Sequence, residues 1–146
     1  MSASAAVELD RDRLARWLLK QKMPSSRLAR TVAHPLKNAA IAALRFTGHQ
    51  HRVAAPLFWD DHFHGFIPEA VTSLVWKYRF YEQATSLFIL RYLNPGDVFV
   101  DIGAHFGYFT LLAARLVGLV PEAGIGHLAF QAGDLGFLLR NVKDTP

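Results

Sequence analysis

The chain of 146 residues contains no cysteine. This absence excludes a disulfide framework, a thiolate nucleophile and any cysteine-ligated zinc or iron–sulfur site. A long hydrophobic run is also missing: a membrane-spanning helix needs about 20 mostly apolar residues, and residues 109–120, the best candidate, are too few and include Arg115. The first ten residues lack the apolar core of a secretory signal. Together these absences predict a soluble, cytoplasmic protein.

The hydrophobic fraction of 51% and the charged fraction of 19% are typical of a folded protein with one sizeable core. The charges are distributed unevenly. Up to Trp59 there are ten basic and three acidic residues, a balance of +7, whereas six basic and nine acidic residues from Asp60 onward give −3. A basic front half can contact nucleic acid, anionic lipid or an acidic partner. A solvated helical face is the simpler interpretation, so neither nucleic acid nor a membrane surface is the expected partner.

Residues 1–50 predict a basic helical segment made of two helices, which break near residues 23–26. Helical spacing places one apolar stripe on each helix. The stripes consist of Leu14, Trp17 and Leu18 on the first helix, and of Leu36, Ala40, Ile41 and Leu44 on the second. Pro35 suits the first turn of the second helix, and Gly48 suits its C-terminal stop.

Residues 51–69 are rich in β-branched and aromatic residues, which favours a short β-hairpin with turn candidates at residues 60–61 and 64–65. The apolar spacing of residues 71–93 predicts one helix, ended by the turn sequence of residues 94–97. Two histidine pairs, at residues 49 and 51 and at residues 62 and 64, have the spacing to reach a metal from a strand. The polar face of a hairpin is the preferred interpretation, and no metal site is predicted.

The C-terminal third predicts the opening of a doubly wound α/β sheet. Residues 98–102 form an apolar run after a turn, as in a strand buried in a parallel sheet. A tight loop follows at residues 103–107, and residues 108–117 resume helical spacing. Residues 127–130 then predict a returning parallel strand, and residues 135–142 another helix. Residues 51–146 would therefore form an incomplete Rossmann-like domain.

The loop from Asp101 to Gly107 is the part of the sequence best suited to bind a ligand. Glycine at the carboxyl end of a strand permits a sharp turn and a close approach of a ligand to the main chain. The following helix start favours a carboxylate or phosphate, and Asp101 can accept from an ammonium group. The spacing G-x-x-x-G differs from the dinucleotide fingerprint G-x-G-x-x-G. From the residues alone, the loop indicates a nucleotide-like ligand.

Residues 93–114, LNPGDVFVDIGAHFGYFTLLAA, resemble the FkbM family of S-adenosylmethionine-dependent methyltransferases. The shared pattern is leucine-x-proline-glycine-aspartate, a hydrophobic strand, and then aspartate-hydrophobic-glycine-alanine-x-hydrophobic-glycine-aromatic. The family's usual asparagine after the alanine is His105 here. Tyr81-Glu82 resembles the lead-in helix, Ala129-Phe130-Gln131-Ala132 stands where alanine-phenylalanine-glutamate-proline is usual, and residues 138–142 resemble the helix that follows.

The resemblance implies the opening part of a Rossmann-like methyltransferase sheet, preceded by an α-helical segment and a short β-hairpin. It implies S-adenosylmethionine as cofactor and methyl transfer to the hydroxyl of a small molecule or sugar. The implied cofactor contacts are Glu82, Asp101, Gly103, Ala104, His105, Gly107 and Gln131. Gln131 replaces the acidic residue that binds the ribose hydroxyls in the family, and no catalytic base is identifiable.

Family members continue with further strands, so we expect an exposed sheet edge that favours self-association. The alternative is a non-catalytic interaction protein whose basic N-terminal helices bind an anionic partner.

Overall fold

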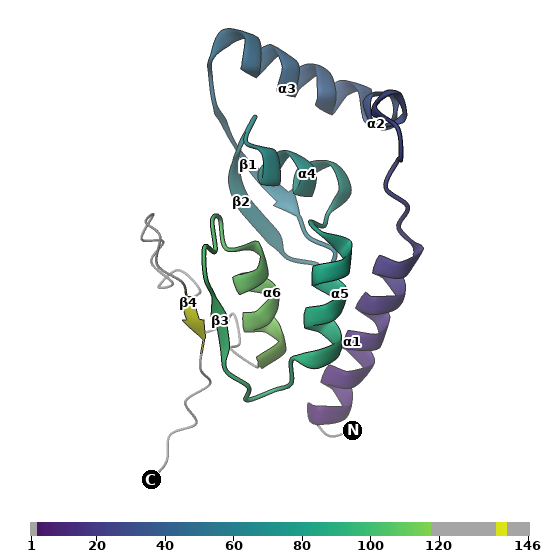
Figure 1. Ribbon diagram of the computed structural model, residues 1–146, viewed down its shortest axis with the longest axis vertical. Helices are drawn as coiled ribbons and strands as arrows, with labels where there is room; N and C mark the ends of the chain where they lie inside the picture. The colour runs from purple at the N-terminus through teal and green to yellow at the C-terminus, as the bar shows by residue number, and fades with distance from the viewer. Residues whose placement is uncertain (1–2, 118–136, 140–146) are drawn as a thin grey trace. The chain divides into compact units, whose positions relative to one another are not determined.

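The structure, a computed structural model, describes residues 3–117 and 137–139 (Figure 1). Over these residues the chain is a mixed α/β protein with six helices and two antiparallel two-stranded sheets. The helices are α1 (Ala3–Lys20), α2 (Arg27–Ala33), α3 (Pro35–Thr47), α4 (Ala70–Tyr78), α5 (Gln83–Tyr92) and α6 (Tyr108–Val117). The strands are β1 (His51–Pro56), β2 (His62–Ile67), β3 (Phe99–Asp101) and β4 (Phe137–Leu139). The chain divides into two compact units, Arg16–Gln83 and the remainder, which comprises Met1–Ala15 and Ala84–Pro146.

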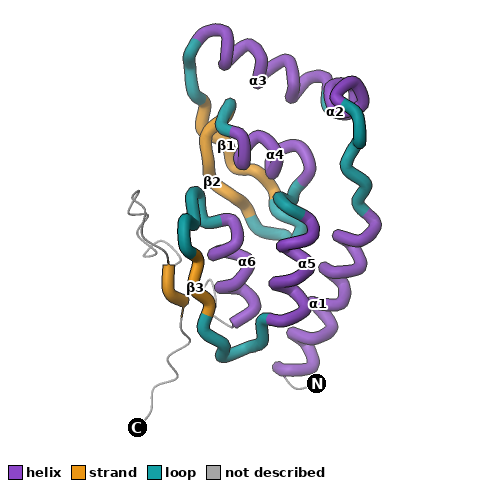
Figure 2. The backbone as a smooth tube through the Cα atoms, in the orientation of Figure 1, coloured by secondary structure: helices purple, strands orange, loops and turns teal. Residues whose placement is uncertain are grey.

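The unit Arg16–Gln83 is built on the hairpin of β1 and β2, drawn in orange in Figure 2. Side chains alternate across β2, so that Phe63 and Ile67 are buried while His62 and His64 are exposed. The hairpin confirms the prediction for residues 51–69. The turn predicted at residues 64–65 was wrong, because Gly65 lies inside β2, opposite Val53, where it packs against Thr72 of α4.

The helical segments depart from the sequence prediction at two places. The structure has an additional short helix, α2, before His34, whereas α3 is the predicted second helix, with Pro35 and Gly48 in their predicted roles at its two ends. The single helix predicted over residues 71–93 was wrong: α4 and α5 are separate. The break follows from the backbone of Arg79, whose φ of 70° is left-handed and cannot continue a helix.

An aromatic cluster forms much of the core of this unit. The rings of Trp17 and Phe58 stack with centroids 5.6 Å apart, and Phe80 meets Trp17 edge-on at 6.2 Å. Trp59 is 1% exposed and contacts Phe58. Trp17 of the predicted α1 stripe thus packs in this cluster, and Leu18 of the same stripe is fully buried.

In the second unit, α5, β3, α6 and the start of α1 are held by packing and by one buried polar side chain, Arg11. Phe99 of β3 and Leu93 pack against Ala113 and Ala114 of α6. Arg11 is only 7% exposed and donates to the carbonyl oxygens of Leu90 (2.8 and 3.0 Å) and Arg91 (3.2 Å) at the end of α5. The cation therefore satisfies carbonyls that the helix itself leaves unpaired.

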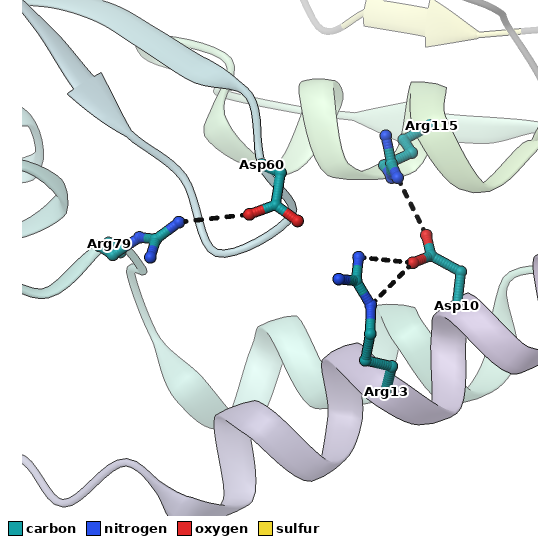
Figure 3. A network of polar contacts seen from close by, with 5 residues as sticks. All are labelled: Asp10, Arg13, Asp60, Arg79 and Arg115. Atoms are coloured by element: carbon teal, nitrogen blue, oxygen red, sulfur yellow. Dashed lines mark hydrogen bonds and ion pairs between the residues drawn. The ribbon is translucent and has the colours of Figure 1, made fainter.

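Surface ion pairs add to each unit (Figure 3). The Asp10 carboxylate lies 3.0 Å from Arg115 of α6 and 2.8 Å from Arg13 of α1. Within the other unit, Arg79 lies 3.5 Å from Asp60. All of these side chains are partly exposed, so each pair contributes about 1 kcal/mol or less.

The β3 region corrects the expected sheet. The partner that the structure describes for β3 is β4, which runs antiparallel with Phe99 opposite Leu139. Residues 137–139 are thus a strand and not part of the helix predicted over residues 135–142, since a short apolar run fits either element until its pairing is known. Val100 and Ile102 are 54% and 84% exposed, so β3 is not buried on both faces. Residues 127–130, the predicted returning strand, lie outside the described residues.

Candidate strand–helix ligand loop

The loop that joins β3 to α6 follows a left-handed path at three residues. Gly103, His105 and Gly107 have φ values of 74°, 50° and 75°. Glycine adopts this conformation without strain, whereas His105 does so at a cost of about 1 kcal/mol. The Gly107 N–H donates to the Ala104 carbonyl (2.7 Å), and the Leu111 N–H donates to the Gly107 carbonyl (2.9 Å). These bonds fix the turn and begin α6, as the sequence predicted.

Asp101, the last residue of β3, is tied to the first turn of α6. The Thr110 hydroxyl donates to Asp101 Oδ2 at 2.6 Å, and Thr110 is 3% exposed. Asp101 itself is half-buried. A charge-assisted hydrogen bond of this kind holds the carboxylate at the strand end and fixes the separation of β3 and α6.

The middle of the loop is open. A Cβ atom placed on Gly103 would meet no atom of the described residues within 4 Å, and the neighbouring Ile102 is 84% exposed. His105 is exposed as well, with its ring edge-on to Phe106 at 4.3 Å between centroids. A ligand could therefore approach the backbone at Gly103 closely.

The helix behind the loop is firmly held. Tyr108 is 3% exposed, and its hydroxyl lies 3.4 Å from the Ser86 hydroxyl of α5. Leu112, Ala113 and Ala114 are completely buried. The start of α6 is thus a rigid support, with the N–H groups of its first turn not used by the helix itself.

The structure brings five of the seven predicted contacts together: Asp101, Gly103, Ala104, His105 and Gly107 all lie in this loop. Glu82 belongs to the other compact unit, where it is exposed and left-handed with a φ of 42°. The pKa of Tyr81 is raised, first by burial and then by the hydrogen bond and charge of Glu82 and by the charge of Glu69. Gln131 lies outside the described residues.

Sequence reasoning missed Thr110. A signal was available in the sequence. A polar threonine stands among apolar residues in the first turn of the predicted helix, nine residues after Asp101. Its short hydrogen bond to Asp101 makes it part of the loop's architecture.

The histidine pairs do not converge. In the hairpin register His51 is opposite Ile67, whereas His62 and His64 are opposite Pro56 and Ala54 on the other face. Among the described residues no group of three His, Cys, Asp or Glu side chains is placed to hold a metal ion.

Comparisons with protein-family models, with curated proteins and with solved structures gave no match. No helix within residues 3–117 is long and apolar enough to cross a membrane.

Proposed function

We propose that the chain binds S-adenosylmethionine through the Asp101–Gly107 loop and supports methyl transfer of the FkbM type to the hydroxyl of a small molecule or sugar. The observation that carries the proposal is Gly103: it is left-handed, no atom in the described part of the chain lies within 4 Å of its Cβ position, and it is placed between Asp101 and the start of α6. The sequence resemblance over residues 93–114 supplies the chemical identity of the ligand.

The residues of the loop fit the amino-acid end of this cofactor. A carboxylate has several acceptor positions, and Thr110 occupies one of those on Asp101. The remaining positions can accept from a ligand ammonium group. The start of α6 favours the ligand carboxylate through its N–H groups and dipole. The ammonium group of the ligand would thus contact Asp101, and its carboxylate would contact the start of α6.

The cofactor, when bound, supplies an already activated methyl group. The task of the chain is then to position the acceptor in line, which dominates the rate of such a transfer. A hydroxyl acceptor also needs a group that takes its proton. No side chain is assigned this role. Gln131 is expected to weaken binding of the ribose, because a neutral hydrogen bond contributes about 1 kcal/mol against roughly 1.5–3 for a charged one.

Calorimetric titration of the purified chain with S-adenosylhomocysteine tests the proposal. We expect saturable one-site binding that is lost in Gly103→Leu and weakened in Asp101→Ala. Gly96→Leu is the matched control, since Gly96 is also left-handed (φ 88°) and open, but lies at the other end of β3. Both glycine variants place a leucine at a left-handed φ, which L-residues adopt only with strain. Absence of binding by a folded sample, or equal loss in both glycine variants, would refute the site.

The exposed side chains on one face of β3 favour a second candidate, a non-catalytic interaction protein. Val98, Val100 and Ile102 are 53%, 54% and 84% exposed, and an uncovered strand face promotes association. Size-exclusion chromatography separates the candidates. Self-association that Val100→Thr with Ile102→Thr abolishes, in a chain that binds no S-adenosylhomocysteine, would favour the interaction protein.

A further inference from the structure

The helices α2 and α3 present apolar side chains to solvent, and one of these, Leu36, belongs to the apolar stripe that the sequence predicted. Leu28 and Val32 of α2 are 75% and 67% exposed, and Leu36 and Phe46 of α3 are 85% and 93% exposed. On α3 the intervals between Leu36, Ala39, Ala43 and Phe46 are three, four and three residues, which places them on one helix face. All four are exposed. We call these four residues the α3 stripe.

The opposite side of α3 packs against its own unit. Ile41 is 6% exposed. The Lys37 ammonium donates to the Trp76 carbonyl (2.5 Å), and the Lys77 ammonium of α4 donates to the Asn38 side-chain oxygen (3.3 Å). Because packing fixes this side, the α3 stripe faces away from the core and remains available.

Positive charge gathers around the same helices without acidic neighbours in sequence. Residues 13–59 contain nine Lys or Arg and no Asp or Glu. In the described part of the chain, no ion pair joins Arg30, Lys37, Arg45 or Lys77 to a carboxylate. Burial, and then the charges of Arg45 and Arg30, lower the pKa of Lys77. The cations are therefore close enough to repel one another, and an external anionic surface would relieve this repulsion.

We propose that α2 and α3 bind the surface of an anionic lipid bilayer, with the α3 stripe and the apolar side chains of α2 at the boundary of headgroups and acyl chains. An amphipathic helix with an apolar face and Lys or Arg side chains nearby lies in this way. The Lys and Arg side chains can attract the anionic headgroups from the other side of the helix, because the helix diameter of about 10 Å is close to the Debye length at 0.1 M salt. This surface does not depend on S-adenosylmethionine binding.

Other occupants fit the observations less well. Nucleic acid would match the positive charge but not four apolar side chains that protrude into solvent, because its phosphates select Lys and Arg. A second copy would bring two basic surfaces together. An acidic protein would need a shape complementary to Leu36 and Phe46, whereas a fluid interface accepts protruding side chains without one.

Co-sedimentation of the full chain with vesicles tests the proposal. We expect binding to phosphatidylglycerol vesicles in 0.1 M NaCl, weak binding to phosphatidylcholine vesicles, and release of the chain in 0.5 M NaCl. Leu36→Ser with Phe46→Ser should lower the partition coefficient by about tenfold or more. Arg30→Gln with Arg45→Gln should lower it by up to about fivefold per charge.

A control pair on α5 makes the result specific. Phe88 and Tyr92 are 62% and 67% exposed, so Phe88→Ser with Tyr92→Ser removes similar apolar surface elsewhere and should leave vesicle binding unchanged. The proposal is overturned if the folded chain does not bind anionic vesicles, if it binds neutral vesicles equally, or if both serine pairs act alike. It is also overturned if inorganic phosphate at matched ionic strength displaces the chain, or if duplex DNA binds with an affinity that the Leu36 and Phe46 changes do not alter.

Discussion

The Thr110 hydroxyl donates a 2.6 Å hydrogen bond to Asp101 Oδ2 across the strand–helix turn. This bond joins the end of β3 to the first turn of α6, and Thr110 is almost completely buried. The loop between them is held at both ends while its centre at Gly103 stays open. Removal of the bond should therefore affect both stability and ligand binding.

Thr110→Val keeps the shape of the side chain and removes the donor. We expect the free energy of unfolding to fall by about 1.5–3 kcal/mol, because the half-buried carboxylate loses a charge-assisted hydrogen bond. Thr110→Ser retains the hydroxyl and should cost less. Urea unfolding of the two variants measures the difference, and an equal or larger loss in Thr110→Ser would show that the methyl group contributes at least as much as the bond.

Arg11→Met should destabilise the chain by about 2–4 kcal/mol, since Leu90 and Arg91 at the end of α5 would lose buried charged donors. Arg11→Lys keeps the charge but lacks the planar guanidinium with its several N–H donors, so it should recover only part of the lost stability. Arg13→Met is the control on the same helix: its side chain is 57% exposed, and its loss should cost below about 1 kcal/mol. Thermal unfolding of the three variants gives the ranking, and a small effect of Arg11→Met would contradict it.

Gly65→Ala should be strongly destabilising, by about 1–3 kcal/mol. Its new Cβ would lie 2.8 Å from the Thr72 methyl carbon and closer still to the Thr72 hydroxyl. Thr72 is fully buried, and its hydroxyl has no hydrogen-bond partner among residues 3–117 and 137–139, so Thr72→Ala makes room without breaking a described bond. The double variant should be more stable than additivity predicts. Strict additivity in a double-mutant cycle would show that the contact is not the cause.

Asp10 should contribute a small pH-dependent stability. Burial raises the pKa of Asp10, but the hydrogen bonds and charges of Arg115 and Arg13 outweigh it and leave this pKa below its ordinary value. The folded state therefore binds the proton less readily than the unfolded chain. The contribution is complete at neutral pH and is lost as the pH falls from about 4 through the folded pKa.

Urea unfolding of the wild type and of Asp10→Asn from pH 7 to pH 2.5 tests this expectation. The two curves should differ by less than about 1 kcal/mol at pH 7, because the pair is partly exposed, and should converge in acid. A difference that persists at pH 2.5 would point to a cause other than charge.

Local signals were sufficient for the parts of the fold that depend on neighbouring residues. The proline and glycine at the ends of α3, the hairpin of residues 51–67 and the strand–loop–helix around Gly103 were all predicted from sequence. The family resemblance placed five of the seven candidate contacts in one loop. Glycine and proline restrict the backbone wherever they occur, so their effect is visible without tertiary information.

The failures arose where distant residues decide the backbone. No glycine or proline marks the break at Arg79. Its carbonyl accepts from the Phe58 N–H (3.0 Å) and its guanidinium donates to the Leu57 carbonyl (2.8 Å), so the end of α4 is set by the β1–β2 turn.

Leu36 was assigned to the apolar stripe of the second helix, but at 100° per residue it lies roughly 140° around α3 from the buried Ile41. The helical identity of residues 137–139 failed because strand pairing cannot be read from a three-residue run.

The two sheets differ greatly in how far apart their partners lie along the chain. The hairpin closes over the five residues between Pro56 and His62, whereas Phe99 must find Leu139 forty positions later. Closing the longer loop costs more entropy and a slower search. During refolding, amide protons of β1 and β2 should therefore become protected from exchange before those of β3. On the ribosome, the β1–β2 hairpin would likewise form before β4 has been synthesised, and the edge of β3 would stay unpaired until then.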